Sequence, residues 1–254
     1  MFLKNIKKIF FFFLLSTLCF THTIPKPTRH KVGLLIVATG RYIEFVEPLV
    51  KSAEKHFLPG HDVTYFVFTN RELPNLECNI VKIEQKRLGW PYDTMMRYEM
   101  YYNAKDHFED IDYLYACDAD MLFVDTVGNE ILGDRVATKH PGFIGKRGTY
   151  ETKRKTSMAY VNSNEGKYYF AGGFNGGKTV QFLNLCKTVT ENIYKDLEKK
   201  IIAIWHDESH INRYYIDNPP TIMLTPSYCY PEQWKLPYHK RLLALDKNHQ
   251  AMRK

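Results

Sequence analysis

Two aspartates stand one residue apart at the end of an apolar run. Asp118 and Asp120 follow the segment 112–117 (DYLYAC) and precede 121–123 (MLF). A solvated acidic turn is one explanation, but apolar sequence on both sides favours a less exposed position. Two carboxylates at a strand end can face one hard cation, and Mn²⁺ or Mg²⁺ held in this way usually carries phosphate oxygens of a ligand. The pair therefore predicts a divalent-cation site.

A second group of ionisable side chains lies at 205–210 (WHDESH). His206 and His210 are four residues apart, as in the zinc helix of metalloproteases, but that helix needs Glu directly after the first His. Here Asp207 takes that place, and Glu208 comes one position later, about 100° further round a helix. The alternative is a helix whose first turn carries acids that the helix dipole favours. The spacing leaves both interpretations open.

The segment 170–177 (FAGGFNGG) has four glycines in six positions and opens a predicted helix. Such a run lets a ligand approach the backbone closely. It has neither the spacing of a phosphate-binding loop nor that of a dinucleotide-binding turn, so it does not by itself indicate a nucleotide.

Strands and helices must position these residues. Apolar or β-branched runs predict four strands in the first half, at 31–39, 62–69, 79–83 and 111–117. Helical periodicity predicts two helices between them, at 43–57 and about 93–105. This order is typical of an α/β domain with a mainly parallel sheet. Ligands of such sheets bind beyond the carboxyl ends of the strands, where Asp118 lies.

The second half is less regular. The segment 146–157 is polar and basic, and we expect a mobile surface loop or lid there. Helices are predicted at 179–197 and at about 203–216. No linker rich in Pro, Gly or Ser divides the chain, so residues 32–254 are expected to form one domain.

Charge and cysteine content narrow the function classes. The net charge of the 254-residue chain is +7, but residues 1–25 contribute +3 and residues 235–254 contribute +5. The body is therefore close to neutral, which argues against a protein that coats nucleic acid. Beyond Cys19, the cysteines are widely spaced and form no C-x-x-C pair, so we expect buried free thiols rather than disulfides or a zinc finger.

The N-terminus carries an apolar run at residues 9–20, behind Lys4, Lys7 and Lys8. A spanning helix needs about 20 apolar residues, so this shorter run predicts a signal peptide or signal anchor at 1–25, with a short stem to about 31. The lysines would stay on the cytoplasmic side and the body would cross. The expected location is the Golgi lumen in a eukaryote, or the membrane, periplasm or cytoplasm in a bacterium.

Several segments, in this order along the chain, resemble glycosyltransferase family 6, which includes the histo-blood-group A and B transferases and the α-1,3-galactosyltransferases. They are 40–44 (GRYIE), 53–57 (AEKHF), 112–120 (DYLYACDAD), 140–143 (HPGF), the glycine run, 205–212 (WHDESHIN) and 247–251 (KNHQA). The resemblance covers about residues 32–254. It implies a glycosyltransferase A-type fold, a single nucleotide-sugar-binding domain whose mainly parallel sheet has helices on both faces.

The resemblance also implies the reaction. A family member transfers α-linked N-acetylgalactosamine or galactose from a UDP-sugar to the 3-hydroxyl of a galactoside, fucosylated or not, with retention of configuration. Tyr42 would stack on uracil, while Asp118 and Asp120 would hold Mn²⁺, or Mg²⁺, on the diphosphate. The donor-binding residues implied are Tyr42, Arg97, Asp118, Ala119, Ala171, Gly172, Gly173, Asp207, Lys247 and Arg253.

Glu208 is the catalytic residue that the resemblance implies, either as a nucleophile or as a base that stabilises an oxocarbenium-like transition state. His140, Trp205 and Glu232 would form the acceptor site. Gly173 leaves room for an acetamido group, which favours N-acetylgalactosamine over galactose as the donor sugar.

Two departures and two alternatives accompany this interpretation. Val37 stands where the family pattern leads us to expect an aromatic residue, and Glu232 follows Pro231 where the mammalian pattern has tryptophan and aspartate. The alternatives are a zinc-dependent hydrolase built on His206 and His210, and a non-catalytic glycan-binding module on the same fold.

Overall fold

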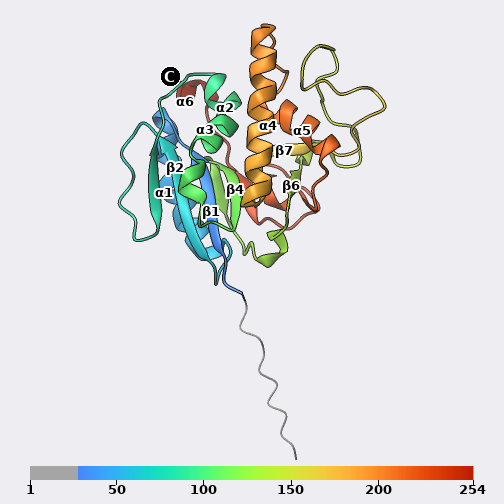
Figure 1. Ribbon diagram of the computed structural model, residues 1–254. Coiled ribbons are helices and arrows are strands. Elements are labelled where there is room, and N and C mark those ends of the chain that lie inside the picture. The colour runs from blue at the N-terminus through green and yellow to red at the C-terminus, as the bar shows by residue number, and fades with distance from the viewer. Residues whose placement is uncertain (1–27, 254) are drawn as a thin grey trace, which may run out of the picture.

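A seven-stranded sheet forms the centre of the structure, a computed structural model that describes residues 28–253 (Figure 1). The strand order is β3-β2-β1-β4-β7-β6-β8. These strands are β1 (Lys31–Val37), β2 (Asp62–Thr69), β3 (Ile80–Glu84), β4 (Tyr113–Asp118), β6 (Val136–Lys139), β7 (Phe170–Lys178) and β8 (Ile222–Leu224). A smaller sheet contains β5 (Met121–Phe123), β10 (Leu242–Ala244) and β9 (Tyr230–Pro231). The leader predicted at 1–25 lies outside the described residues.

The four strands predicted in the first half are present, and β3, β2, β1 and β4 are parallel neighbours. Side chains of β1 alternate between the faces of the sheet, as a pleated strand requires. Leu34 and Ile36 belong to one hydrophobic core, and Leu35 belongs to the other. The continuous apolar run of β1 is therefore explained by burial on both faces.

The sheet is mixed and largely parallel, because β7 runs antiparallel to both β4 and β6. The glycine run forms this strand, and the helix that it was predicted to open begins only at Thr179. Glycine is needed for close packing here: a Cβ on Gly176 would lie 2.2 Å from the carbonyl oxygen of Leu114. No period-2 pattern of large side chains marks β7, so the sequence did not show it as a strand.

Helices cover both faces of the sheet (Figure 1). The α-helices are α1 (Val46–His56), α2 (Tyr92–Met95), α3 (Arg97–Asn103), α4 (Thr179–Glu198), α5 (Asp207–Asp217) and α6 (His249–Arg253). Short 3₁₀ helices are η1 (Gly40–Phe45), η2 (Lys105–Phe108), η3 (Asn129–Ile131), η4 (Pro141–Phe143) and η5 (Pro226–Tyr228). The predicted helix 43–57 is thus η1 followed by α1, and the predicted helix 93–105 is interrupted at Met96.

The segment 146–157 is a surface loop, as its polarity predicts, but part of it is attached to the body. Tyr150, Glu151 and Ser157 are buried. The Glu151 carboxylate accepts hydrogen bonds from the backbone N–H groups of Arg154 and Ile204, both at 3.0 Å. These contacts attach the loop to the chain just before α5.

Free thiols were expected for the cysteines beyond Cys19. The four cysteines that the structure describes are free; Cys117, Cys186 and Cys229 are buried, and Cys78 is half-buried. Within residues 28–253, no helix has the length and apolar character needed to cross a membrane.

Candidate active site

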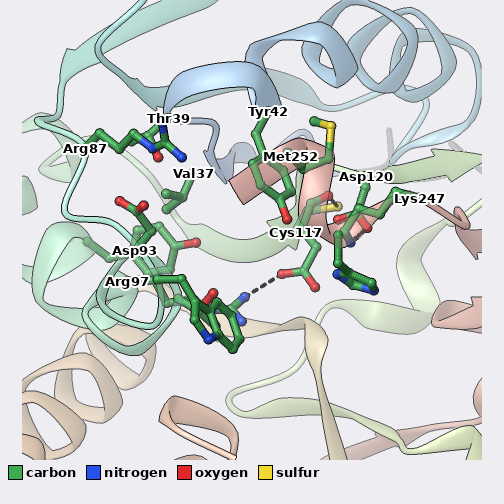
Figure 2. A pocket seen from close by; sticks show the side chains of 16 residues that line it. Val37, Thr39, Tyr42, Arg87, Asp93, Arg97, Cys117, Asp120, Lys247 and Met252 are labelled. Atoms are coloured by element: carbon green, nitrogen blue, oxygen red, sulfur yellow. Dashed lines mark hydrogen bonds and ion pairs between the residues drawn. The ribbon is translucent and has the colours of Figure 1, made fainter. Parts of the chain in front are cut away.

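A cavity of about 220 Å³ opens at the carboxyl ends of β1 and β4 (Figure 2). These strands are adjacent, with β2 on the other side of β1, so the cavity lies where the chain order of the sheet reverses. We call it the switch-point cavity. Six of the predicted donor-site or metal-site residues line it: Tyr42, Arg97, Asp118, Ala119, Asp120 and Lys247.

Arg97 connects the cavity to two carboxylates. Its Nη1 donates to Asp118 Oδ1 at 2.5 Å and to the carbonyl oxygen of Gly172 at 3.3 Å. Its Nε lies 2.7 Å from Asp207 Oδ2, an ion pair without hydrogen-bond geometry. Burial disfavours the charged guanidinium, but Asp207 and Asp118 outweigh this effect and hold the pKa of Arg97 above its usual value. The buried arginine therefore stays charged and fixes both acids.

Asp120 contacts the ammonium group of Lys247, which comes from the C-terminal segment. Burial and the charge of Asp118 raise the pKa of Asp120, while Lys247 opposes this shift. The same ammonium lies 5.7 Å from the centre of the Tyr42 ring, and the backbone N–H of Leu245 donates to the Asp120 carbonyl oxygen at 2.9 Å. The basic tail of the sequence is thus attached at the aspartate pair.

The aspartate pair fits a divalent cation that is shared with a phosphate ligand. Asp118 and Asp120 line the same cavity, and burial together with the charge of Asp118 raises the pKa of Asp120. A cation would relieve that crowding. Residues 28–253 contain no group of three or more His, Cys, Asp or Glu side chains that could hold a metal ion. Two carboxylates with phosphate oxygens and water are a common ligand set for Mg²⁺-type cations.

Glu208 lies in the first turn of α5, beside the glycine run. Its Oε2 accepts a hydrogen bond from the backbone N–H of Gly172 at 2.9 Å. Burial raises the pKa of Glu208 to about 7, and the Gly172 N–H partly opposes this. Asp207, the first residue of α5, is also buried, which raises its pKa to about 6 against the effect of Arg97. The predicted first turn rich in acids is confirmed.

Gly172 and Gly173 place the backbone next to both sets of acids. A Cβ on Gly172 would lie 3.5 Å from Arg97 Nη2 and 3.6 Å from Glu208 Oε2. A Cβ on Gly173 would lie 3.3 Å from Asp118 Oδ2. Ala171, by contrast, is buried in the hydrophobic core. The glycine run therefore brings the backbone between the switch-point cavity and Glu208.

The two histidines of the zinc alternative point to different surroundings. His210 is buried, with Nε2 3.6 Å from Asp196 Oδ2. The ring of His206 packs edge to face on Trp90, with 4.9 Å between ring centres. His206 also precedes α5 in a left-handed conformation (φ +52°), so the pair does not occupy one helix. The structure gives the zinc site no support.

The predicted acceptor residues are only partly brought together. The His140 ring lies 5.8 Å from the Tyr169 ring, and burial lowers its pKa to about 4, so it is neutral. Trp205 is 46% exposed, three residues before Glu208, and its Nε1–H donates to Thr149 Oγ1 at 3.0 Å. The Glu232 carboxylate accepts from the backbone N–H of Asp246 at 3.0 Å and so supports the tail.

Several residues at these sites were missed from the sequence. Trp234 is 47% exposed, and its ring lies 3.8 Å from where a Cβ on Gly142 would stand. In the sequence, a tryptophan only two residues after Glu232 could have indicated that Trp234 belongs to the same region. The switch-point cavity is also lined by Arg87, Trp90, Asp93, Thr94, His249 and Met252. Arg253 is the last residue of α6, and its side chain lies outside the description.

Comparisons with known proteins agree with these features. The model of the family described as glycosyltransferase family 6 matches residues 22–254. Histo-blood group ABO system transferase 1 of Rattus norvegicus is 37% identical over 238 residues, which are 87% of this chain and 68% of that protein. Globoside alpha-1,3-N-acetylgalactosaminyltransferase 1 of Gallus gallus is 32% identical over 244 residues, 89% of this chain and 70% of that protein. O-antigen biosynthesis glycosyltransferase WbnI of Escherichia coli is 26% identical over 226 residues, 87% of this chain and 96% of that protein.

Proposed function

The chain belongs to glycosyltransferase family 6, and on that premise we propose that it transfers N-acetylgalactosamine from UDP-N-acetylgalactosamine to the 3-hydroxyl of a galactoside, retaining the α configuration. One observation carries the proposal: Arg97 joins the Asp118–Asp120 pair to the α5 acids beside Gly172. A nucleotide-binding region and a buried carboxylate thus meet at one place. The names of the globoside relatives, which specify α-1,3 transfer of N-acetylgalactosamine, support the donor and linkage.

The donor nucleotide would occupy the switch-point cavity. Tyr42 would stack on the uracil ring, beside Val37 at the end of β1. Asp118 and Asp120 would hold Mn²⁺ or Mg²⁺, which when bound neutralises the diphosphate and makes it a better leaving group. The Lys247 ammonium, and Arg253 from the same tail, would add positive charge at the diphosphate. Asp207 would bind hydroxyls of the donor sugar while Arg97 holds it in place.

Glu208 would act on the face of the sugar away from the diphosphate. As the bond between the anomeric carbon and the diphosphate oxygen breaks, positive charge develops on the sugar ring. A carboxylate on the opposite face stabilises this charge or attacks the carbon, and either course leads to retention. The Gly172 N–H fixes one oxygen of Glu208 and so orients the side chain for this role.

The choice of donor depends on space beside Asp118. Gly173 has no side chain there, and a Cβ would already lie 3.2 Å from Cys229 Sγ. The acetamido group of N-acetylgalactosamine needs this space. On the acceptor side, His140 and Trp205 would flank the terminal galactose, with or without a neighbouring fucose.

Release of UDP tests the proposal. We would measure UDP release from UDP-N-acetylgalactosamine and UDP-galactose, with Mn²⁺ or EDTA, in the presence of galactosides with and without fucose. Asp120→Asn and Glu208→Gln should each lower kcat by about 10²–10⁴-fold. Asp134→Asn, at an exposed ion pair with Lys178, is the matched control and should retain full activity.

The outcomes separate the alternatives. Activity that is unchanged by EDTA and by Asp120→Asn would remove the metal assignment. Saccharide binding without turnover of either UDP-sugar would favour a glycan-binding module instead. Transfer of galactose in preference to N-acetylgalactosamine would overturn the donor assignment but not the reaction.

We also propose that residues 1–25 direct the chain to or across a membrane, with the catalytic domain on the far side. The apolar run behind three lysines supports this. Fractionation of cells expressing the full chain or residues 28–254 is the test. Equal recovery of both forms in the soluble fraction would contradict the proposal.

A further inference from the structure

A second cavity, of about 400 Å³, lies beside η4 and η5. We call it the basic cavity. Four of the residues that line it are basic, Lys139, Lys146, Arg147 and Lys167, and none of its lining residues is acidic. Aromatic rings form much of the remaining wall, namely Phe143, Tyr168, Tyr169 and Tyr238. The net charge of the wall is therefore strongly positive, although the body as a whole is close to neutral.

The lysines of the basic cavity contact rings rather than acids. Lys139 and Lys167 both lie over the Tyr168 ring, with Nζ 4.9 Å and 5.3 Å from its centre. Lys146 Nζ lies 5.9 Å from the centre of Phe143. Among residues 28–253, none of these three ammonium groups has a carboxylate partner. Like charges gathered without counterions repel one another, so this arrangement favours a bound anion.

Arg147 adds to the positive charge. Its guanidinium donates to the carbonyl oxygens of Asn162 and Glu165, at 2.9 Å and 3.4 Å, and stacks over Tyr150. Carbonyl oxygens orient the guanidinium but do not neutralise it. The two acids close in sequence pair with other arginines: Glu151 with Arg154 at 2.6 Å, and Glu165 with Arg213 at 3.1 Å.

Tyr169 connects the basic cavity to the surroundings of Glu208. Tyr169 lines it and directly precedes β7, whose Gly172 binds Glu208. Burial, and then the charge of the nearby Glu208 carboxylate, raise the pKa of the Tyr169 hydroxyl. His140, which flanks the proposed acceptor position, contacts the ring of Tyr169. An acceptor whose terminal galactose reaches Glu208 would thus extend into the basic cavity.

On the basis of the proposed function, we propose that the basic cavity binds the part of the acceptor glycan beyond its terminal galactose, and that this part is anionic. The anion would be the carboxylate of an acidic sugar, or a phosphate or sulfate ester. The lysines would pair with it, while the aromatic rings would pack against the sugar rings. The acceptor class is therefore an acidic, galactose-terminated glycan.

Matched acceptors test the charge directly. We would compare a galactose-terminated trisaccharide containing glucuronate with its methyl ester, and the corresponding phosphate ester with its neutral parent. At about 50 mM salt, KM should be at least about 10-fold lower for each acid than for its neutral counterpart, and at 0.5 M salt the ratio should approach one. The acidic group, carboxylate or phosphate, whose KM falls further below that of its neutral counterpart identifies the chemistry of the natural anion.

Lysine variants locate the effect. Lys146→Gln and Lys167→Gln should each raise KM for the acidic acceptors about 3–10-fold, leave kcat unchanged, and leave KM for the methyl ester unchanged. Lys187→Gln, on the exposed surface of α4, is the matched control and should change none of these values.

The inference would be overturned by equal KM values for acid and ester, or by lysine variants that change KM for both acceptors alike. It would also be overturned if the protein bound vesicles of anionic lipid through these lysines but did not discriminate between acceptors. Release of UDP with the methyl ester monitors the proposed function separately. If no acceptor supports turnover, calorimetric binding of the glucuronate trisaccharide and of its ester still tests the basic cavity.

Discussion

The switch-point cavity and the basic cavity differ in how their charged side chains are paired. In the switch-point cavity, the central basic groups face acids: Arg97 lies between Asp118 and Asp207, and Lys247 contacts Asp120. In the basic cavity, the lysines lie over aromatic rings and face no acid. The first cavity contains its own counterions, whereas the second would obtain them from a ligand.

The difference follows from how each cavity is built. The switch-point cavity is formed at the ends of β1 and β4, elements with a fixed register. Buried charges need paired partners, and regular elements can hold such partners at fixed distances. The basic cavity is formed by the end of β6, loops and short 3₁₀ helices at the surface, where a charged side chain can remain solvated without a partner. Substitutions in the two cavities should therefore have very different effects.

The largest expected effect is on stability at Arg97. Arg97→Met removes the charge that Asp118 and Asp207 share, and leaves two acids unpaired. Loss of one partner of a buried ion pair typically costs about 3–5 kcal/mol. Urea unfolding measures the change, with Arg29→Met at the exposed pair with Asp62 as the control, expected to cost under about 1 kcal/mol. A similar cost at both sites would refute the contrast between buried and surface charge.

A smaller effect is expected on donor selectivity at Gly173. Gly173→Ala places a methyl group against Cys229 and Asp118, in the space assigned to the acetamido group. The ratio of kcat/KM for UDP-N-acetylgalactosamine to that for UDP-galactose should fall about 10–100-fold, the usual range for one methyl group in a pocket. The methyl group of Gly172→Ala would lie against Arg97 and Glu208 instead, so kcat/KM should fall by the same factor with both donors. An unchanged ratio in Gly173→Ala would place the acetamido group elsewhere.

Protonation of Glu208 should affect stability by a smaller amount. Because the carboxyl pKa is raised from about 4.5 to about 7 in the folded state, the folded protein binds this proton more tightly than the unfolded chain does. Stability is therefore full below pH 4.5 and falls as the pH rises to about 7. Glu208→Gln removes this loss, so at pH 8 its Tm should exceed that of the native protein by about 2–6 °C.

The same titration acts on catalysis in the opposite direction. The proposed role of Glu208 requires the ionised carboxylate, so kcat should fall as the pH drops below about 7. At pH 5 the Tm difference between Glu208→Gln and the native protein should have largely vanished. A Tm difference that is independent of pH would show that Glu208 is not held in a low-dielectric position.

The smallest effect is expected at the basic cavity. Lys146→Gln and Lys167→Gln remove charges that stabilise no acid, so the free energy of unfolding should change by no more than about 0.5 kcal/mol. Urea unfolding at low salt is the measurement, because screening is weakest there. A loss of 2 kcal/mol or more would mean that these lysines have structural partners and that the two cavities do not differ as described.

Much of this organisation could be predicted from the sequence. The strands 62–69 and 31–37, the aspartate pair after β4 and the acids opening α5 follow from hydrophobic runs and local spacing. The glycine run was recognised as a place of close backbone approach, but not as a strand. Its small residues carry no alternating pattern, and only packing against Leu114 shows why they are glycines.

The basic cavity could not be foreseen for a similar reason. Lys139 ends β6, whereas Lys146 and Lys167 lie far apart in the segment between η4 and β7, and nothing in their spacing brings them to one wall. His206 and His210 are the opposite example. Their i, i+4 spacing resembled a zinc site, but His210 lies beside Asp196 whereas His206 packs on Trp90.

The sequence by itself determined the four parallel strands of the first half, the acids after β4 and at the start of α5, and the family to which the chain is similar. These depend on periodicity and on motifs, which are local properties of a chain. Only the tertiary structure decided that Arg97 joins Asp118 to Asp207 and that Gly172 holds Glu208. It also decided that Lys139, at the end of β6, and Lys167, just before β7, lie over the ring of Tyr168. Such contacts join residues far apart in the chain, and their positions are set by strand register and side-chain packing, which no local pattern encodes.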